Sequence, residues 1–259
     1  MKRGQVTAFI IIGIIILIGV GLLIYLTART QEEIVQQEGE ETIATGAIPV
    51  KDYIDNCMNR AAEDAVVHVS LRGGYYEVIG AHASFGDIDI PYYFYEGQKN
   101  MPAREDIQKE LVLAFENYVG QCLLGLETFM EQGYQFNEKG EETVTAAIVE
   151  NNVFFEVIVP LEIVKDEDTF RYDRFSGNAK LPLDKMIGLT EQFAVFQAEN
   201  PNALRMAHLI DLSLENGIKT EIIRQSEGEV IFYMIDDNTV AGGKPYGFAF
   251  AVKYTGEVE

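Results

Sequence analysis

Basic residues are scarce in this chain of 259 residues. Lysine and arginine total 20 against 41 aspartate and glutamate residues, which gives a formal net charge of −21 at pH 7. Binding to a phosphate backbone needs clustered basic side chains, so nucleic acid is excluded as a partner. The same charge argues against docking on an anionic lipid surface. An acidic surface of this kind keeps an extracellular domain soluble.

The residues that usually build catalytic and metal sites are also few. The three histidines, His68, His82 and His208, have neither HxxxH nor HExxH spacing, and two cysteines cannot make a zinc cage. The chain has no GxSxG, P-loop or GxGxxG motif, and its acidic turns do not match a calcium loop. We therefore predict a protein that is not an enzyme and has no cofactor or metal. The alternative is a membrane-anchored extracellular hydrolase whose site is assembled from distant residues.

One long run without any charge stands near the start of the chain, from Val6 to Leu26. At 1.5 Å per residue, a helix of about 21 residues spans the hydrocarbon core of a bilayer. Lys2 and Arg3 precede the run, and basic residues near a membrane stay in the cytoplasm. We therefore predict a single-pass protein of the plasma membrane. Residues 6–26 would anchor it in the lipid bilayer, with the N-terminus inside and the C-terminal domain outside.

The first residues also carry a family resemblance. The sequence KRGQVT at residues 2–7 resembles an archaeal class III, or type IV pilin-like, signal sequence. The resemblance implies cleavage between Gly4 and Gln5 on the cytoplasmic side, and pilin-like self-assembly of the mature chain. Phe9 stands where that class commonly has an acidic residue, which argues against filament assembly more than against processing. A plain signal anchor is the alternative.

After the anchor, the sequence predicts a short stalk and one large domain. Residues 1–27 form the N-terminal segment and anchor, residues 28–49 an acidic stalk or linker, and residues 50–259 the extracytoplasmic domain. A subdivision near 136–140 is left open. Apolar residues at helical spacing predict two long amphipathic helices, at Val50–Leu71 and Ala103–Glu131.

Strands and two shorter helices are expected in the rest of the domain. The strands are predicted at 142–149, 153–164, 169–175, 218–225, 229–235 and 245–254, and the helices at 183–198 and 201–217. Asn151-Asn152 fits the turn of a hairpin, and Pro160 indicates a bulge or a sheet edge. Because helices and antiparallel strands are segregated, we expect an α+β fold. It would comprise an N-terminal transmembrane helix, two long packed amphipathic helices, antiparallel hairpins and two shorter helices.

Each of the two long helices carries one cysteine on its apolar stripe, Cys57 in the first and Cys122 in the second. The two stripes are expected to face each other outside the membrane, where disulfides persist. We therefore predict a disulfide between Cys57 and Cys122. Two buried free thiols are the alternative.

A second resemblance covers most of the predicted domain. Its marks are PVKDYIDNC at 49–57, GGY at 73–75, IPYYFYEG at 90–97, MP at 101–102, and the passage from 175 to 183. In this order they are similar to a group of archaeal membrane-anchored proteins of unknown function. The resemblance implies a membrane-anchored location and one coherent domain, and no activity.

Tyrosines crowd the segment before the second long helix. Tyrosine combines apolar area with a hydrogen-bonding tip, so Tyr92, Tyr93 and Tyr95 are predicted as a surface for a protein or glycan partner. Alternation in an extended segment would expose Tyr93 and Tyr95 and bury Tyr92 and Phe94. The alternative is that these rings cover the two long helices as part of the core.

Overall fold

The computed structural model describes residues 48–199, 204–226 and 228–254, all within the unit Ala47–Glu259. The anchor expected at 6–26, the cleavage site at Gly4 and Gln5, and most of the stalk lie outside the described residues. Within the described ranges, the helices are too short or too polar to cross a membrane. The domain boundaries drawn from the sequence stay a prediction.

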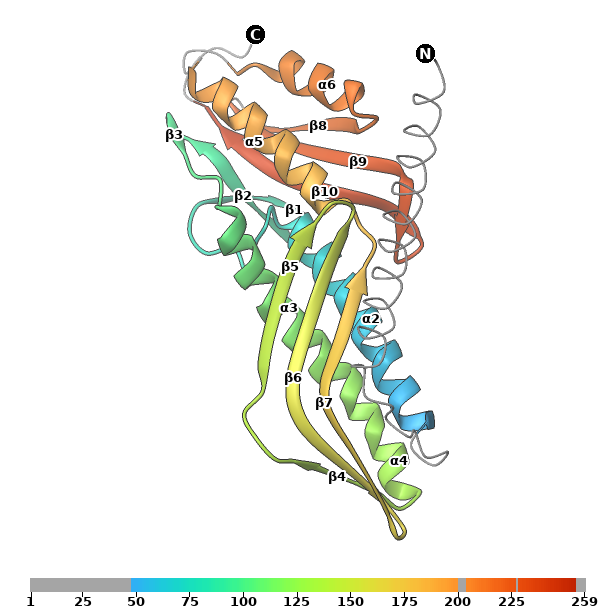
Figure 1. Ribbon diagram of the computed structural model, residues 1–259. Coiled ribbons are helices and arrows are strands. Elements are labelled where there is room, and N and C mark those ends of the chain that lie inside the picture. The colour runs from blue at the N-terminus through green and yellow to red at the C-terminus, as the bar shows by residue number, and fades with distance from the viewer. Residues whose placement is uncertain (1–47, 200–203, 227, 255–259) are drawn as a thin grey trace, which may run out of the picture. The chain divides into compact units, whose positions relative to one another are not determined.

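Helix α2, Ile48–Leu71, is the longest of the described helices (Figure 1). Its apolar residues recur every three or four positions, and those on one face, such as Ile54, Met58 and Val69, are buried. The helix ends at a glycine pair: Gly74 has a φ of 87°, and its N–H donates to the Val69 carbonyl over 2.9 Å. The first long helix predicted from the sequence is confirmed.

The second long helix, α3 (Arg104–Leu123), packs beside α2 (Figure 1). The sequence predicted one helix as far as Glu131, but α3 gives way to a 3-10 turn, η1 (Leu124–Leu126), and then to the short helix α4 (Glu127–Glu131). Gly125 lies in this turn, so close to the Tyr53 hydroxyl that a Cβ atom would overlap it. The change in helix geometry therefore coincides with a close approach to α2.

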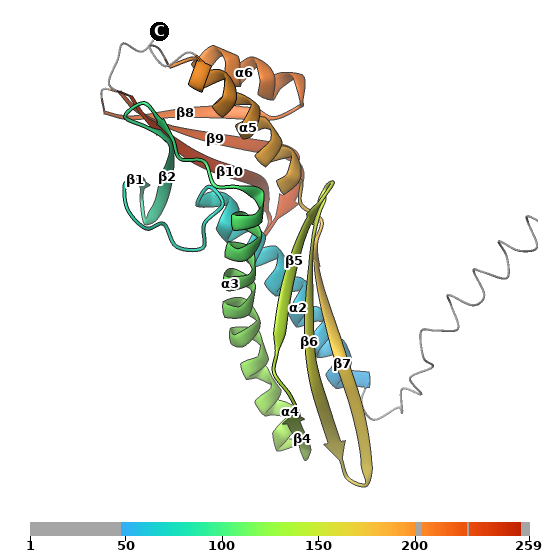
Figure 2. The same cartoon turned by 60° about the vertical axis from the view of Figure 1, so that its left-hand side comes forward.

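A four-stranded antiparallel sheet covers one side of the α2–α3 pair (Figures 1 and 2). Its strands are β4 (Tyr134–Glu138), β5 (Thr143–Val149), β6 (Asn152–Lys165) and β7 (Asp168–Ala179). The 14-residue strand β6 is central, and β7 pairs along one of its edges. Along the other edge, β5 pairs with the first half of β6 and β4 with its last residues. Helix α2 packs against β7, and α3 against β5.

Two local predictions for this sheet can be compared with the structure. The predicted hairpin forms, but its turn lies one residue earlier than Asn151-Asn152: Val149 pairs with Asn152, so Glu150 and Asn151 make the turn, and Asn151 has a φ of 55°. Pro160 lies in a bulge, where the register between β6 and β7 shifts between Ile158 and Leu161. A proline cannot donate to the ladder, so the strand accommodates it where regular pairing stops.

The second sheet has the strand order β1-β2-β10-β9-β8, and β3 pairs with β2. Its strands are β1 (His82–Phe85), β2 (Ile88–Tyr95), β3 (Gln98–Lys99), β8 (Lys219–Ser226), β9 (Glu229–Ala241) and β10 (Lys244–Lys253). Strands β2 and β10 are parallel, and the other pairs are antiparallel. Helices α5 (Leu183–Glu199) and α6 (Met206–Glu215) lie over one face (Figures 1 and 2).

One continuous hydrophobic core joins the two sheets through α2 and α3. Near the first sheet, the rings of Phe115 and Phe155 stack with their centroids 4.3 Å apart. Near the second sheet, the ring of Phe193 in α5 packs on Phe232, 5.6 Å between centroids. A smaller apolar cluster around Tyr92 lies on the other face of the second sheet.

The predicted fold class is wrong. The sequence favoured an α+β domain organised by helices and antiparallel hairpins, but the chain forms a mixed α/β fold in which strands account for about 41% of the described residues. Two sheets are present, and one of them contains a parallel pair made by β2 and β10. The pairing of strands far apart in the chain is not encoded in local periodicity, so the hairpins were found and this crossover was not.

Candidate functional site

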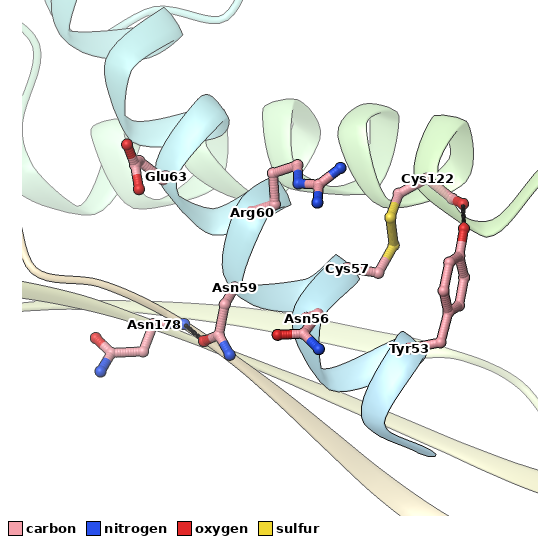
Figure 3. A pocket seen from close by; sticks show the side chains of 8 residues that line it. All are labelled: Tyr53, Asn56, Cys57, Asn59, Arg60, Glu63, Cys122 and Asn178. Atoms are coloured by element: carbon pink, nitrogen blue, oxygen red, sulfur yellow. Dashed lines mark hydrogen bonds between the residues drawn. A yellow bond between two sulfur atoms is a disulfide. The ribbon is translucent and has the colours of Figure 1, made fainter. Parts of the chain in front are cut away.

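A polar pocket of about 570 Å³ lies along one flank of α2, beside β7 and the end of α3 (Figure 3). Most of its lining comes from α2, because positions three and four apart share one side of a helix. The lining residues are Tyr53, Asn56, Cys57, Asn59, Arg60, Glu63, Cys122 and Asn178.

A disulfide between Cys57 of α2 and Cys122 of α3 closes one end of this pocket (Figure 3). The predicted disulfide is therefore confirmed. The two cysteines are 65 positions apart, and the chain-entropy model gives about 4 kcal/mol of stabilisation for a loop of that length. Tyr53 reinforces the same contact: its hydroxyl donates to the Cys122 carbonyl over 2.8 Å, and its ring meets Phe129 edge to face.

Asparagine amides fix the opposite wall of the pocket. The side-chain oxygen of Asn59 accepts a hydrogen bond from the Asn178 backbone N–H over 3.0 Å, which ties β7 to α2 (Figure 3). The amide nitrogen of Asn59 donates to the Asp55 carbonyl, also over 3.0 Å. Asn56 donates in the same way to the Asp52 carbonyl over 2.7 Å. Both amides are thus held in place by the helix that carries them.

Arg60 and Glu63 are the charged members of the lining. One carboxylate oxygen of Glu63 accepts the backbone N–H of Gly242 over 2.7 Å, in the turn between β9 and β10. The Arg60 guanidinium has no ion pair or hydrogen bond with any other described residue. Burial, and next the charge of Glu63, raise the pKa of the neighbouring Asp64, whereas Arg60 lowers it. The pocket therefore offers one guanidinium that is free to bind.

These groups provide hydrogen bonds, and neither a free thiol nor an imidazole is among them. Both cysteines are in the disulfide, and no histidine lines the pocket. In the part of the chain that the structure describes, no three His, Cys, Asp or Glu residues are grouped so that they could hold a metal ion. The arrangement is chemically suited to binding a polar ligand through amide, guanidinium and carboxylate groups.

The three tyrosines predicted as a partner surface lie in β2, and two of them are buried. Tyr93 is only 2% exposed, and its hydroxyl donates to the Gly73 carbonyl over 3.0 Å. Tyr92 is also buried and donates to Glu229 over 2.7 Å, an arrangement in which burial and then Glu229 raise its pKa. Tyr95 is half-buried, with its ring 5.2 Å from that of Tyr92. The expected exposure of Tyr93 is wrong.

A bulge in β2 explains this result. Tyr92 pairs with Ala251 and Phe94 pairs with Val252, so Tyr93 is an extra residue in the ladder. Tyr93 and Phe94 both belong to the main core, whereas Tyr92 and Tyr95 pack with the cluster on the opposite face. Strict alternation placed Tyr93 on the same face of the sheet as Tyr95, whereas the bulge places it on the same face as Phe94. The sequence gives no sign of this bulge.

The structure does not assemble the histidines into one site. His68 of α2 is half-buried, with Nδ1 3.0 Å from the Tyr118 hydroxyl and Nε2 2.8 Å from the Tyr76 carbonyl. His82 lies in β1 and His208 in α6. Both ring nitrogens of His68 therefore have a hydrogen-bond partner, as expected for a histidine at the edge of the core.

Sequence reasoning did not single out the polar residues of the pocket. Asn56, Asn59, Arg60 and Glu63 recur at helical spacing on α2, which is a signal of one polar flank. Any solvated helix face has the same pattern, so the signal did not distinguish a site. Asn178 comes from β7, and its place in the pocket depends on tertiary packing.

Comparison with protein-family models, with curated proteins and with solved structures finds no match to this chain.

Proposed function

We propose that this chain is a cell-surface binding protein, held at the plasma membrane by residues 6–26. Two features support the location. The run of uncharged residues follows Lys2 and Arg3, which favours an N-terminus inside and the domain outside. The domain also contains a disulfide, a bond that persists outside the cytoplasm.

The pocket beside the disulfide is proposed to bind a neutral, hydroxyl-rich ligand such as a surface glycan. The observation that carries this proposal is the Arg60 guanidinium, which has no hydrogen bond or ion pair with another described residue and shares the pocket with three asparagine side chains. Hydroxyl groups both donate and accept, so they match guanidinium, amide and carboxylate groups together. An anion would meet Glu63 and a chain of net charge −21. Tyr53 adds an aromatic surface that suits the apolar face of a sugar.

Binding of the full-length protein to an array of neutral and acidic oligosaccharides tests the proposal, in a detergent without a sugar head group. Neutral oligosaccharides are expected to bind, and Arg60→Ala is expected to weaken binding on the order of tenfold, because hydrogen bonds to charged groups contribute about 1.5–3 kcal/mol. Arg224→Ala, on the exposed part of β8, is the matched control. Absence of neutral-sugar binding, or an equal loss in both variants, would contradict the proposal.

Pilin-like self-assembly is a second candidate, favoured by the KRGQVT sequence at residues 2–7. In that case, the domain would serve as a structural subunit of a surface filament. The processed N-terminus distinguishes this candidate from a plain anchored protein.

The alternative of an anchored hydrolase has no set of described residues to support it. In the ranges that the structure describes, no serine hydroxyl is hydrogen-bonded to a histidine; Ser70, for example, contacts the Val66 carbonyl and the Tyr246 hydroxyl. A binding role therefore has more support than catalysis.

A further inference from the structure

A second cavity, of about 420 Å³, lies on the core side of α2, between the helices and the sheet β4–β7. Its apolar lining combines buried side chains with half-buried ones. It includes Ile54, Met58, Val157, Leu123 and Leu126. Met130 of α4 also lines the cavity and is 52% exposed, so the apolar surface continues out to solvent at α4.

The charged groups that line this cavity are carboxylates. Glu138 ends β4, and Glu142 lies just before β5. Burial raises the pKa of Glu142, and the negative charges of Glu116 and Glu138 raise it further. Lys139 lies beside Glu138 in sequence, but its ammonium is 3.6 Å from Glu162 instead and does not line the cavity. The cavity is therefore apolar inside, and its negative charge lies at the exposed side chains of Glu138 and Glu142.

We propose that this cavity binds an amphiphile with a single unbranched hydrocarbon chain and a cationic head group. The volume is within the range of small-molecule pockets, and flexible methionine and leucine side chains can adapt to a chain. A cationic head beside Glu138 and Glu142 would offset the repulsion between these carboxylates. An anionic head would meet like charge, which selects against the commonest membrane lipids with negative head groups.

This site is independent of the pocket beside the disulfide. Ile54 and Met58 lie on the side of α2 that faces the sheet, whereas Asn56 and Arg60 line the other pocket. The amphiphile proposal therefore does not rest on the glycan proposal, and either can fail alone.

Photo-crosslinking in phosphatidylcholine nanodiscs tests the proposal on the full-length protein. The probe is a dodecyltrimethylammonium ion with a diazirine at the end of its chain, and peptide mass spectrometry locates the label. We expect label on peptides that contain Met58, Leu123 or Val157. Unlabelled dodecyltrimethylammonium is expected to compete, and the decyl analogue to compete on the order of tenfold less well, because two methylene groups fewer are buried.

Variants separate the roles of charge and cavity. Glu138→Gln combined with Glu142→Gln is expected to lower labelling by the cationic probe at least threefold, with labelling by a neutral dodecanol-based probe unchanged. Glu215→Gln, exposed on α6, is the matched control. Val157→Phe fills the cavity and is expected to reduce labelling by both probes on the order of tenfold; circular dichroism reports whether it folds.

Three outcomes would overturn the proposal. The first is label confined to peptides outside the cavity. The second is equal labelling by both probes with no effect of the two glutamine substitutions, a result that stands whether or not Val157→Phe folds. The third is full labelling of a folded Val157→Phe variant.

Discussion

Tyr93 is among the largest fully buried side chains of the described residues. Its ring stacks on Phe250 with 4.9 Å between centroids, and its hydroxyl donates to the Gly73 carbonyl just after α2. One side chain thus connects the bulged strand β2 with both β10 and the end of the longest described helix. At the residue scale, this tyrosine is a core residue with one buried hydrogen bond.

Substitutions at Tyr93 test this role. Tyr93→Phe is expected to lower the free energy of unfolding by about 1–2 kcal/mol, because it removes the donor to the buried Gly73 carbonyl. Tyr93→Ala is expected to cost about 3–5 kcal/mol through the cavity it leaves. Tyr95→Ala is the comparison, at a half-buried ring, and its loss is expected to be clearly smaller. Chemical denaturation followed by circular dichroism measures all three, and equal small losses for the two alanine variants would contradict a core role.

His68 is a second residue whose contacts define its chemistry. A carbonyl can only accept, so Nε2 carries the proton that reaches the Tyr76 carbonyl, and Nδ1 accepts from the Tyr118 hydroxyl. Burial lowers the pKa of His68; the bond to Tyr76 raises it, and the charge of Arg72 lowers it. The net direction is downward, so the folded chain favours the neutral imidazole.

This lowered pKa predicts a loss of stability in mild acid. As pH falls, the unfolded chain takes up a proton at His68 first, near its ordinary value of 6.5. The stabilisation that comes from keeping His68 neutral is fully present above pH 6.5 and is lost as pH falls from there through the pKa of His68 in the folded chain. Between about pH 7 and pH 5, we expect the melting temperature to fall more for the wild type than for His68→Gln. Parallel curves for wild type and His68→Gln would contradict the prediction.

At the scale of elements, the contact between β7 and α2 depends on a glycine. A Cβ atom on Gly177 would lie 2.6 Å from the Met58 carbonyl oxygen and 3.1 Å from the Phe115 ring. Helix and strand therefore approach more closely than any larger residue would allow. This approach also brings Asn178 next to Asn59, and so shapes the polar pocket.

Gly177→Ala is expected to lower the free energy of unfolding by about 1–3 kcal/mol, because the backbone of α2 must shift to admit the methyl group. Gly188→Ala is the matched control: Gly188 lies in α5 with no heavy atom within 4 Å of its added Cβ. This control is expected to stabilise by about 0.5–1 kcal/mol, since alanine is the better helix former. Thermal melting of the two variants measures both effects. Stabilisation by both substitutions would contradict the close contact between Gly177 and the Met58 carbonyl.

The helices were largely predictable from the sequence, since their signal is local. The first long helix was predicted at Val50–Leu71 and found at Ile48–Leu71, and a later one at 183–198 was found at Leu183–Glu199. The disulfide followed from the two long helices predicted at Val50–Leu71 and Ala103–Glu131, because their facing apolar stripes place Cys57 and Cys122 together. Periodicity within one stretch of chain was sufficient for each helix, whereas the disulfide also required the expectation that the two long helices pack together.

The sheets were only partly predictable. Hairpins such as β5–β6 follow from a turn and its neighbours, but β10 lies between β9 and β2 because of tertiary packing. The bulge at Tyr93 is likewise a consequence of pairing with Val252 and Ala251, which come from the far end of the chain. Local reasoning therefore found strands and missed the architecture that joins them.

At the scale of the whole molecule, α2 separates two cavities of different chemistry. One flank offers Arg60 and amide groups beside the disulfide, and the core side opens on an apolar cavity with Glu138 and Glu142. The α2 side of the polar pocket was visible in the sequence as a polar flank. The apolar cavity was not, because its wall combines α2, α3, α4 and three strands.

Processing of the N-terminus decides between an anchored protein and a pilin-like subunit. Because residues 2–7 resemble a class III signal sequence, the mature protein isolated from its native membrane is expected to begin at Gln5, and mass spectrometry of the intact chain measures this start. A chain that begins at Met1 would leave a plain signal anchor and exclude pilin-type processing. Both of these outcomes retain residues 6–26, so both keep the domain at the membrane. Cleavage after Ala28, just beyond the apolar run, would instead be that of a secretory signal peptide. A chain cut there would have lost residues 6–26, which would contradict the membrane anchor together with the pilin-like candidate.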